Sequence, residues 1–219
     1  MQNFDFTHFS IPCKQKHWNN INFPLTLDSA GNLYGVTDIG GAYGWGFVFK
    51  LASTSKGPWT LTTLYSFNVA PAPYSPFSGL IFDSAGNLYG TTSLGGTEGV
   101  GTVYELSPSS GGAWTERDIV DFPASCSPVC KPESGVILDS AGNLFGTTPY
   151  SGAYNFGSAY EVSPNGDGTW TLTGLHDFGS GTDGLYPGSG VLLDVSGKLY
   201  GTTIEGGTAR SGTVFQITP

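Results

Sequence analysis

The sequence predicts an all-β protein built from four copies of one structural unit, and three observations lead to this fold class. An eight-residue motif recurs at nearly constant spacing, no segment keeps a helical period, and short apolar runs alternate with turn residues. Glycine makes up 34 of the 219 residues, which is typical of a chain with many tight turns. These features exclude the disordered and collagen-like classes.

The repeated motif is Asp-Ser-Ala-Gly-Asn-Leu-Tyr-Gly, which begins at Asp28 and recurs unchanged from Asp83. It returns from Asp139 with phenylalanine in place of tyrosine, and from Asp194 in a looser copy. Successive motif aspartates are 55 or 56 residues apart, so four units fill the chain and two unlike domains are excluded. The units span about 21–67, 76–122, 132–178 and 187–219, and are called units 1 to 4 below.

The sequence pattern of each unit predicts four short strands. The first is an apolar run that ends at the motif aspartate, as in 79–83, and a Ser-Ala-Gly turn connects it to the second. After a glycine-rich loop, the third is a segment such as 101–106. The fourth follows a turn of Ser, Pro and Gly residues, as in 114–122. We therefore expect the repeated aspartates to hold turns.

The two ends of the chain predict how the repeats close. Unit 4 ends at Pro219, directly after its third strand, and residues 6–9 match the ends of the fourth strands at 64–67, 119–122 and 175–178. A strand from residues 4–9 that completes the last sheet would close a ring and leave no free edge there. The sequence thus predicts one domain over 1–219, a four-bladed β-propeller with four strands per blade.

The repeat resembles the GloVer (Gloeobacter/Verrucomicrobia) tandem repeat of bacterial proteins. The resemblance rests on a pattern running from Leu-x-x-Asp-Ser-Ala-Gly-Asn-Leu-Tyr-Gly-Thr-Thr to Gly-Thr-Val-Tyr-x-Leu-x-Pro. The copies at 80–108 and 136–164 cover it well, whereas those at 25–51 and 191–219 depart from it at Val36 and Lys198. The core is also similar to NHL propeller repeats. The resemblance implies an exported or surface-anchored protein and supplies no catalytic residues.

Charge and hydropathy limit the classes of partner and the cellular locations that the protein is expected to have. Eight Lys and Arg residues against 17 Asp and Glu give an acidic protein of net charge −9, which disfavours nucleic acid as a partner. No run approaches the roughly 20 apolar residues that span a bilayer, so no membrane insertion is expected. Met1 to Ser10 lack the features of a signal peptide, so either the protein is not exported or its leader is absent from this chain. The family resemblance favours a secreted or cell-surface protein.

The expected ligand site lies on the loops in which the four copies differ, because binding residues concentrate on loops of a rigid scaffold. Propeller strand order places the second-to-third loops and the fourth-to-first connections on one face. The second-to-third loops of units 1 and 3 carry the aromatic residues Tyr43, Trp45, Tyr150, Tyr154 and Phe156. Those of units 2 and 4 carry the charged residues Glu98, Glu205 and Arg210. The variable positions of the fourth-to-first connections, expected to ring the channel mouth, are Asn22, Phe77, Glu133 and Gly188.

Three functions fit this face. Exposed aromatic rings beside carboxylates and a guanidinium suit a sugar, so non-catalytic recognition of a glycan or another small polar ligand is the leading hypothesis, with no cofactor and no metal. If two of Glu98, Glu133 and Glu205 face each other across a pocket, the face could instead belong to a carbohydrate-active hydrolase or lyase. The third hypothesis is a structural repeat module that binds a protein partner, with the aromatic rings packed down.

Other reactive residues give weaker signals. His8 and His176 fall near the ends of outer strands, and His17 stands without a second histidine nearby. Residues 165–168 resemble a calcium loop but lack its later glutamate, so a plain turn is favoured. The tryptophans that recur in the fourth strands, expected to be packing residues, are Trp59, Trp114 and Trp170.

The three cysteines are Cys13, Cys126 and Cys130. In an oxidising compartment Cys126 and Cys130 could form a local disulfide and leave Cys13 free. The alternative is three ordinary thiols, and the family resemblance favours the disulfide.

Overall fold

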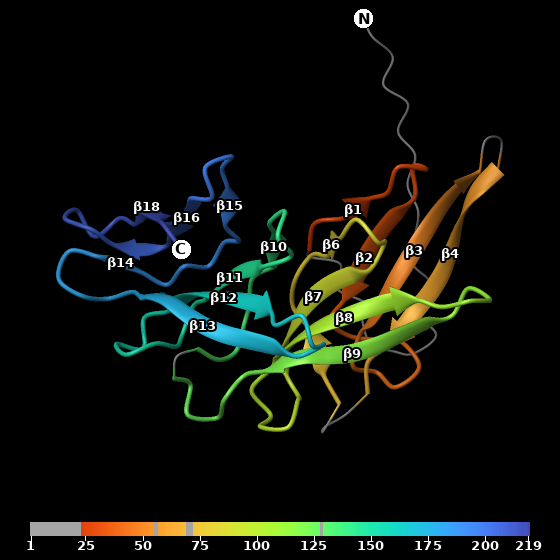
Figure 1. Cartoon of the computed structure of the whole chain (residues 1–219), viewed down its shortest axis with the longest axis horizontal. Coiled ribbons are helices and arrows are strands. Elements are labelled where there is room, and N and C mark those ends of the chain that lie inside the picture. The colour runs from red at the N-terminus through yellow and green to blue at the C-terminus, as the bar shows by residue number, and fades with distance from the viewer. Residues whose placement is uncertain (1–22, 55–56, 69–71, 128) are drawn as a thin grey trace, which may run out of the picture.

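The computed structural model describes residues 23–54, 57–68, 72–127 and 129–219. Within these ranges every regular element is a β-strand, which confirms the all-β prediction. None of these residues belongs to a helix capable of crossing a membrane. Figure 1 shows the strands grouped into antiparallel sheets that follow one another along the chain. Residues 4–9, predicted to complete the last sheet, lie outside the described residues.

Units 1 and 3 each form the four-stranded sheet expected from the sequence, with strands paired in chain order. The strands of unit 1 are β1 (Thr26–Leu27), β2 (Leu33–Thr37), β3 (Phe47–Thr54) and β4 (Gly57–Ser66). Those of unit 3 are β10 (Ile137–Leu138), β11 (Leu144–Thr148), β12 (Ser158–Pro164) and β13 (Trp170–Asp177).

Units 2 and 4 contain additional short strands. Unit 2 has the four expected strands, β6 (Ile81–Phe82), β7 (Leu88–Leu94), β8 (Thr102–Pro108) and β9 (Trp114–Asp121), and β5 (Tyr74–Pro76) also pairs with β7. Unit 4 has β15 (Leu192–Leu193), β16 (Leu199–Thr203) and β18 (Thr213–Ile217) in one sheet. Beside it, β14 (Gly184–Leu185) pairs with β17 (Glu205–Gly206). The added strands β5 and β14 belong to the connections that lead into these units, where the sequence predicts loops.

The motif glycine makes room for an aromatic ring on the neighbouring strand. In unit 2, Gly90 on β7 pairs with Tyr104 on β8, and a Cβ atom at Gly90 would lie 2.4 Å from the tyrosine hydroxyl. The same glycine–aromatic pairing occurs in the other units, at Gly35 and Phe49, Gly146 and Tyr160, and Gly201 and Phe215. The glycine is therefore required for packing in every sheet.

The motif aspartates hold the first turn of each unit. Asp83 Oδ1 accepts hydrogen bonds from the backbone N–H groups of Ala85 (2.8 Å) and Asn87 (2.9 Å), and Oδ2 accepts from the Asn87 amide and the Tyr89 hydroxyl. Burial tends to raise the pKa of Asp83, but these hydrogen bonds outweigh it and lower the pKa. Equivalent turn bonds form at Asp28, Asp139 and Asp194. The aspartates are scaffold residues.

The core consists of contacts between successive sheets. We call the side of a sheet that faces the next unit its forward face, and the opposite side its rear face. Tyr34, Val36 and Val48 on the forward face of unit 1 pack on the rear face of unit 2 around Leu88 and Tyr104. The same contact recurs twice along the chain, with Tyr89 and Val103 packed on Leu144, Tyr160 and Val162, and Phe145 packed on Val191 and Leu199.

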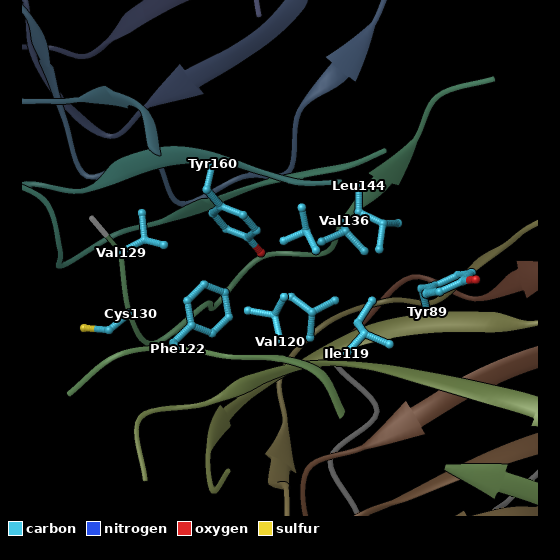
Figure 2. Close-up of a cluster of buried hydrophobic side chains, with 11 residues drawn as sticks. Tyr89, Ile119, Val120, Phe122, Val129, Cys130, Val136, Leu144 and Tyr160 are labelled. Atoms are coloured by element: carbon cyan, nitrogen blue, oxygen red, sulfur yellow. The ribbon is translucent and has the colours of Figure 1, made fainter. Parts of the chain in front are cut away.

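Figure 2 shows the cluster between units 2 and 3, in which the rings of Phe122 and Tyr160 lie 5.3 Å apart between their centroids. Of the recurring tryptophans, Trp114 and Trp170 join these clusters, and Trp59 packs on a cluster within unit 1, which supports their predicted role in packing. Seen together, the sheets form an open arc, with β1, β6, β10 and β15 along its inner side and β4, β9 and β13 along its outer side (Figure 1). Units 1 and 4 are the two ends of this arc.

Candidate ligand site

The four fourth-to-first connections, called the inner connections below, meet around one pocket of about 290 Å³. Every unit contributes to its wall, through residues 23–24, 77–80, 133–137, and 188 with 190. Three of the four positions expected to ring a channel mouth, Phe77, Glu133 and Gly188, therefore line the same cavity. The fourth, Asn22, lies outside the described residues.

The inner connections that lead into units 2, 3 and 4 each contain a residue with left-handed backbone. Lys131 has a φ of 52°, and its N–H donates to the carbonyl of Val100 in the preceding second-to-third loop (2.9 Å). The equivalent residues Ser75 and Tyr186 have φ values of 58° and make the same bond, to Trp45 and Phe156. The inner connections and the second-to-third loops thus emerge on one face, which we call the loop face.

Buried hydroxyl groups tie the wall of the pocket together. Ser78 Oγ accepts a hydrogen bond from the Thr91 N–H (3.1 Å), and the Thr91 hydroxyl donates to the carbonyl of Ser134 in the next unit (3.1 Å). The Thr147 hydroxyl likewise donates to the carbonyl of Ser189 (2.9 Å). Sequence reasoning missed this network, although the Ser-Gly pair of the inner connections and the Gly-Thr-Thr of the second strands in units 2 to 4 were its signal.

The pocket has an aromatic side and an acidic group. The rings of Phe23 and Phe77 lie 5.2 Å apart at an interplanar angle of 60°. Glu133 is half-buried, and this burial raises its pKa, while the positive charge of Lys131 opposes the shift. Glu133 is the one carboxylate among the described residues that line the pocket. An apolar ring pair with a single polar anchor can hold a small ligand that has one apolar side and several hydroxyl groups.

The predicted aromatic residues lie on the loop face outside this pocket. Tyr43, Trp45, Tyr150 and Tyr154 are exposed, and Phe156 is half-buried. In unit 1 the Trp45 ring packs edge-on against Tyr74, with 5.1 Å between centroids. In unit 3 both Tyr150 and Phe156 contact Tyr186, at 5.8 and 5.5 Å. Both aromatic loops contact a tyrosine of the following inner connection, and part of the ring surface in each loop is exposed.

The predicted charged residues Glu98, Glu205 and Arg210 are also exposed. None of the three lines the pocket, and within the described part of the chain none forms a salt bridge. The structure therefore does not bring Glu98 or Glu205 into the cavity that contains Glu133.

A disulfide joins Cys126 and Cys130, the pair that the sequence favoured, and their Cα atoms lie 4.7 Å apart. Cys130 is buried in the cluster between units 2 and 3, and the chain continues through Lys131 to Glu133. The disulfide thus fixes the inner connection that carries the carboxylate of the pocket. Cys13, His8 and His17 lie outside the described residues.

An acidic pair that sequence reasoning missed lies between the outer strands of units 1 and 2. Glu116 and Asp118 lie on β9, at positions where the fourth strands of units 1 and 3 carry apolar or small residues. Burial raises the pKa of Glu116 to about 7, and the neighbouring charge of Asp118 adds to the shift. Burial also raises the pKa of Asp118. The sequence signal for this acidic pair was the segment Trp-Thr-Glu-Arg-Asp, at a position where unit 3 has Trp-Thr-Leu-Thr-Gly.

The remaining polar candidates have structural contacts. His176 Nε2 lies 2.7 Å from Asp183 Oδ2 at the end of β13. Asp167 Oδ1 accepts hydrogen bonds from the Thr169 N–H and hydroxyl, so residues 165–168 form a turn. Within the described ranges, no group of three or more His, Cys, Asp or Glu side chains could hold a metal ion.

Comparison with known proteins identifies the repeat. A family described as the Gloeobacter/Verrucomicrobia repeat matches residues 2–215. No curated protein matches the sequence. Among solved structures, the chain is similar to a protein of unknown function from Dyadobacter fermentans DSM 18053, with 14% identity and a TM-score of 0.50. The similarity covers 89% of this chain and 63% of that one, so this chain spans less than two thirds of its length, and the likeness concerns the fold alone.

Proposed function

The chain belongs to the Gloeobacter/Verrucomicrobia repeat family, and we propose that it is a non-catalytic recognition module for a glycan or a similar small polar ligand. In this proposal the four sheets are consecutive propeller blades within one domain, and the ligand binds on the loop face. Variable loops on a rigid scaffold are a common basis for binding sites.

The observation that carries the proposal is the pocket formed by the four inner connections. Its volume of about 290 Å³ is near the lower end of the roughly 300–1,000 Å³ typical of small-molecule sites, which suits a ligand of about one sugar ring. The rings of Phe23 and Phe77 offer an apolar surface for the C–H side of such a ring. The Glu133 carboxylate can accept hydrogen bonds from its hydroxyl groups.

The composition of the pocket favours binding over hydrolysis. Glycoside hydrolysis uses two carboxyl groups about 5–10 Å apart, one to donate or accept a proton and one to act as nucleophile or base. Among the described residues of the pocket wall, Glu133 is the one carboxylate, while Glu98 and Glu205 lie elsewhere on exposed loops. The exposed rings of Tyr43 and Tyr154 could extend the contact surface for a longer glycan.

The disulfide supports a location outside the cytoplasm. Disulfides persist in oxidising compartments and are rare where thiols are kept reduced. The bond between Cys126 and Cys130 therefore favours a secreted or cell-surface protein.

A glycan-array screen of the whole chain tests the proposal, with mass spectrometry of each bound spot to detect cleavage. We expect binding without cleavage, and at least a tenfold loss of affinity for Phe77→Ala and Glu133→Gln. The matched control is Thr171→Ala, an exposed position on β13 away from the pocket wall. Thermal melts of all variants separate loss of binding from loss of folding.

Each result has a defined meaning. Binding lost in the pocket variants but not in Tyr43→Ala or Tyr154→Ala places the ligand in the pocket. The reverse pattern would move the site to the aromatic loops. Cleavage of a bound glycan would overturn the non-catalytic proposal, and no binding across the array would favour a module for protein contacts.

A further inference from the structure

The forward face of unit 4 exposes apolar side chains whose equivalents are buried in every other unit. Val214 on β18 is 80% exposed, whereas Val48, Val103 and Ala159 at the same position of units 1 to 3 are 0% exposed. In units 1 and 2 the side chain at this position belongs to the cluster shared with the next sheet. Unit 4 therefore carries the same contact surface, and no sheet of the described residues packs on it.

Two further positions extend this surface. Leu192 on β15 is 73% exposed, although Ile81 and Ile137 at the same position are half-buried. Thr202 on β16 is exposed, whereas its equivalents Thr91 and Thr147 are buried. The hydroxyl groups of those two equivalents donate to a carbonyl of the next unit. The forward face of unit 4 thus offers both the apolar and the polar half of the contact.

The rear face of unit 1 exposes the other side of the same contact, the side that in units 2 to 4 packs on the preceding unit. Leu25 is 46% exposed, whereas its equivalents Leu80, Val136 and Val191 are buried against the preceding unit. Leu27 is also exposed, whereas Phe82 at the same position packs edge-on against Tyr34 of the preceding unit. One end of the arc therefore presents a forward face and the other end a rear face.

We propose that two copies of this chain join end to end, so that the forward face of unit 4 in each copy packs on the rear face of unit 1 in the other. Val214 and Leu192 then contact Leu25 and Leu27 of the second copy. The Thr202 hydroxyl donates to the Phe23 carbonyl of the second copy, the position that corresponds to Ser134 and Ser189. Both contacts form around one two-fold axis, and the two arcs complete a ring.

The occupant is a second copy because the exposed surfaces continue an interface that the chain already forms three times. A further contact of the same kind would extend the arc beyond unit 4, and Figure 1 shows units 1 and 4 at opposite ends of the arc. A forward-on-rear contact between identical chains is head to tail, and such contacts either close into rings or grow into filaments. Apolar patches of this kind mark protein interfaces.

Sedimentation equilibrium of the whole chain over micromolar concentrations tests the association. We expect twice the chain mass, and we expect Val214→Glu to weaken association at least tenfold. Val214 is exposed in the single chain, so the substitution should not prevent folding, and circular dichroism checks this. The control Thr171→Glu places the same charge on exposed β13 and should leave the mass unchanged. A monomer at all concentrations, a mass that rises without limit, or a dimer unaffected by Val214→Glu would overturn the proposal.

Cysteine cross-linking distinguishes a second copy from closure within one chain. With Cys13 replaced by serine in all samples, the variants Leu25→Cys and Val214→Cys are mixed and oxidised. A cross-linked product that contains one of each chain supports the proposal. If instead the two single variants fail to cross-link while the double variant links within one chain, the ring closes on itself and the proposal is wrong.

Discussion

The Tyr65 hydroxyl on β4 donates a 3.0 Å hydrogen bond to Oε2 of Glu116 on β9 and thereby joins the outer strands of units 1 and 2. The other carboxylate oxygen, Oε1, is buried and has no hydrogen-bond partner among the described residues. A carboxylate in this position is costly when ionised, because burial removes its hydration and the charge of Asp118 lies nearby. The interface between units 1 and 2 should therefore be sensitive to pH.

We expect the protein to be less stable at pH 8 than at pH 5.5. The folded-state pKa of Glu116 is raised to about 7 from its ordinary 4.5, so between these values the folded protein binds more protons than the unfolded chain. Stability is then highest near and below the lower value and falls as the pH rises through the upper one, by about 1–3 kcal/mol. Differential scanning calorimetry at several pH values measures this change.

The control for the pH effect is a neutral side chain of the same shape. Glu116→Gln should remove most of the decrease in Tm between pH 5.5 and pH 8, and Glu98→Gln, on an exposed loop, should leave it unchanged. A decrease that persists in full in Glu116→Gln would show that other groups cause it.

Replacing a motif aspartate should destabilise the fold at neutral pH. Asp83→Ala removes the acceptor for two backbone N–H groups and two side chains, and we expect a loss of about 1–3 kcal/mol in the free energy of unfolding. Since the pKa of Asp83 is lowered in the folded state, its contribution is present above about pH 4 and decreases in more acidic solution. Urea unfolding at pH 7 measures the loss. Asp167→Ala, in the exposed turn at 165–168, should change stability by less than about 0.5 kcal/mol.

The repeat made most of the fold predictable from sequence, because each turn signal appears four times and each occurrence supports the others. The Asp83 turn and the fourth strand of unit 2 could be placed from residue types alone. The pocket could be placed in part, because the copies differ at Phe77 and Glu133 and the ligand site was expected at such variable positions. The ring pair with Phe23 could not be found this way, because unit 1 departs from the Ser-Gly pattern there and the contact spans two units.

The missed elements depend on contacts distant in sequence. Strand β5 exists because Tyr74 and Pro76 pair with β7, and a three-residue segment has no periodicity to reveal it. The strand pattern of the sequence does not mark Glu116 as buried. Its burial follows from the position of β4 in the neighbouring unit, which a strand pattern does not specify.

The motif glycine should not tolerate even alanine. Gly90→Ala would place a methyl group 2.4 Å from the hydroxyl of the fully buried Tyr104, and the ring cannot move without disturbing the cluster between units 1 and 2. We expect a loss of about 1–3 kcal/mol, as for other overpacked cores. Gly135→Ala is the matched control, because its methyl group would make contacts of 3.7 Å or more and its backbone is not left-handed. Equal losses in the two variants would contradict the packing explanation.

Removing the disulfide should weaken ligand binding even under conditions in which the protein stays folded. The bond between Cys126 and Cys130 closes a short loop, and its loss should lower the free energy of unfolding by about 2 kcal/mol through chain entropy. Because the same segment leads directly into Lys131 and Glu133, the carboxylate should become less well positioned. We therefore expect the Cys126→Ser, Cys130→Ser double variant to bind the array ligand several-fold more weakly at a temperature where it is fully folded. Calorimetric titration of the two proteins measures the difference, and unchanged affinity would mean that the buried Val129 and the hydroxyl network hold Glu133 in place without the disulfide.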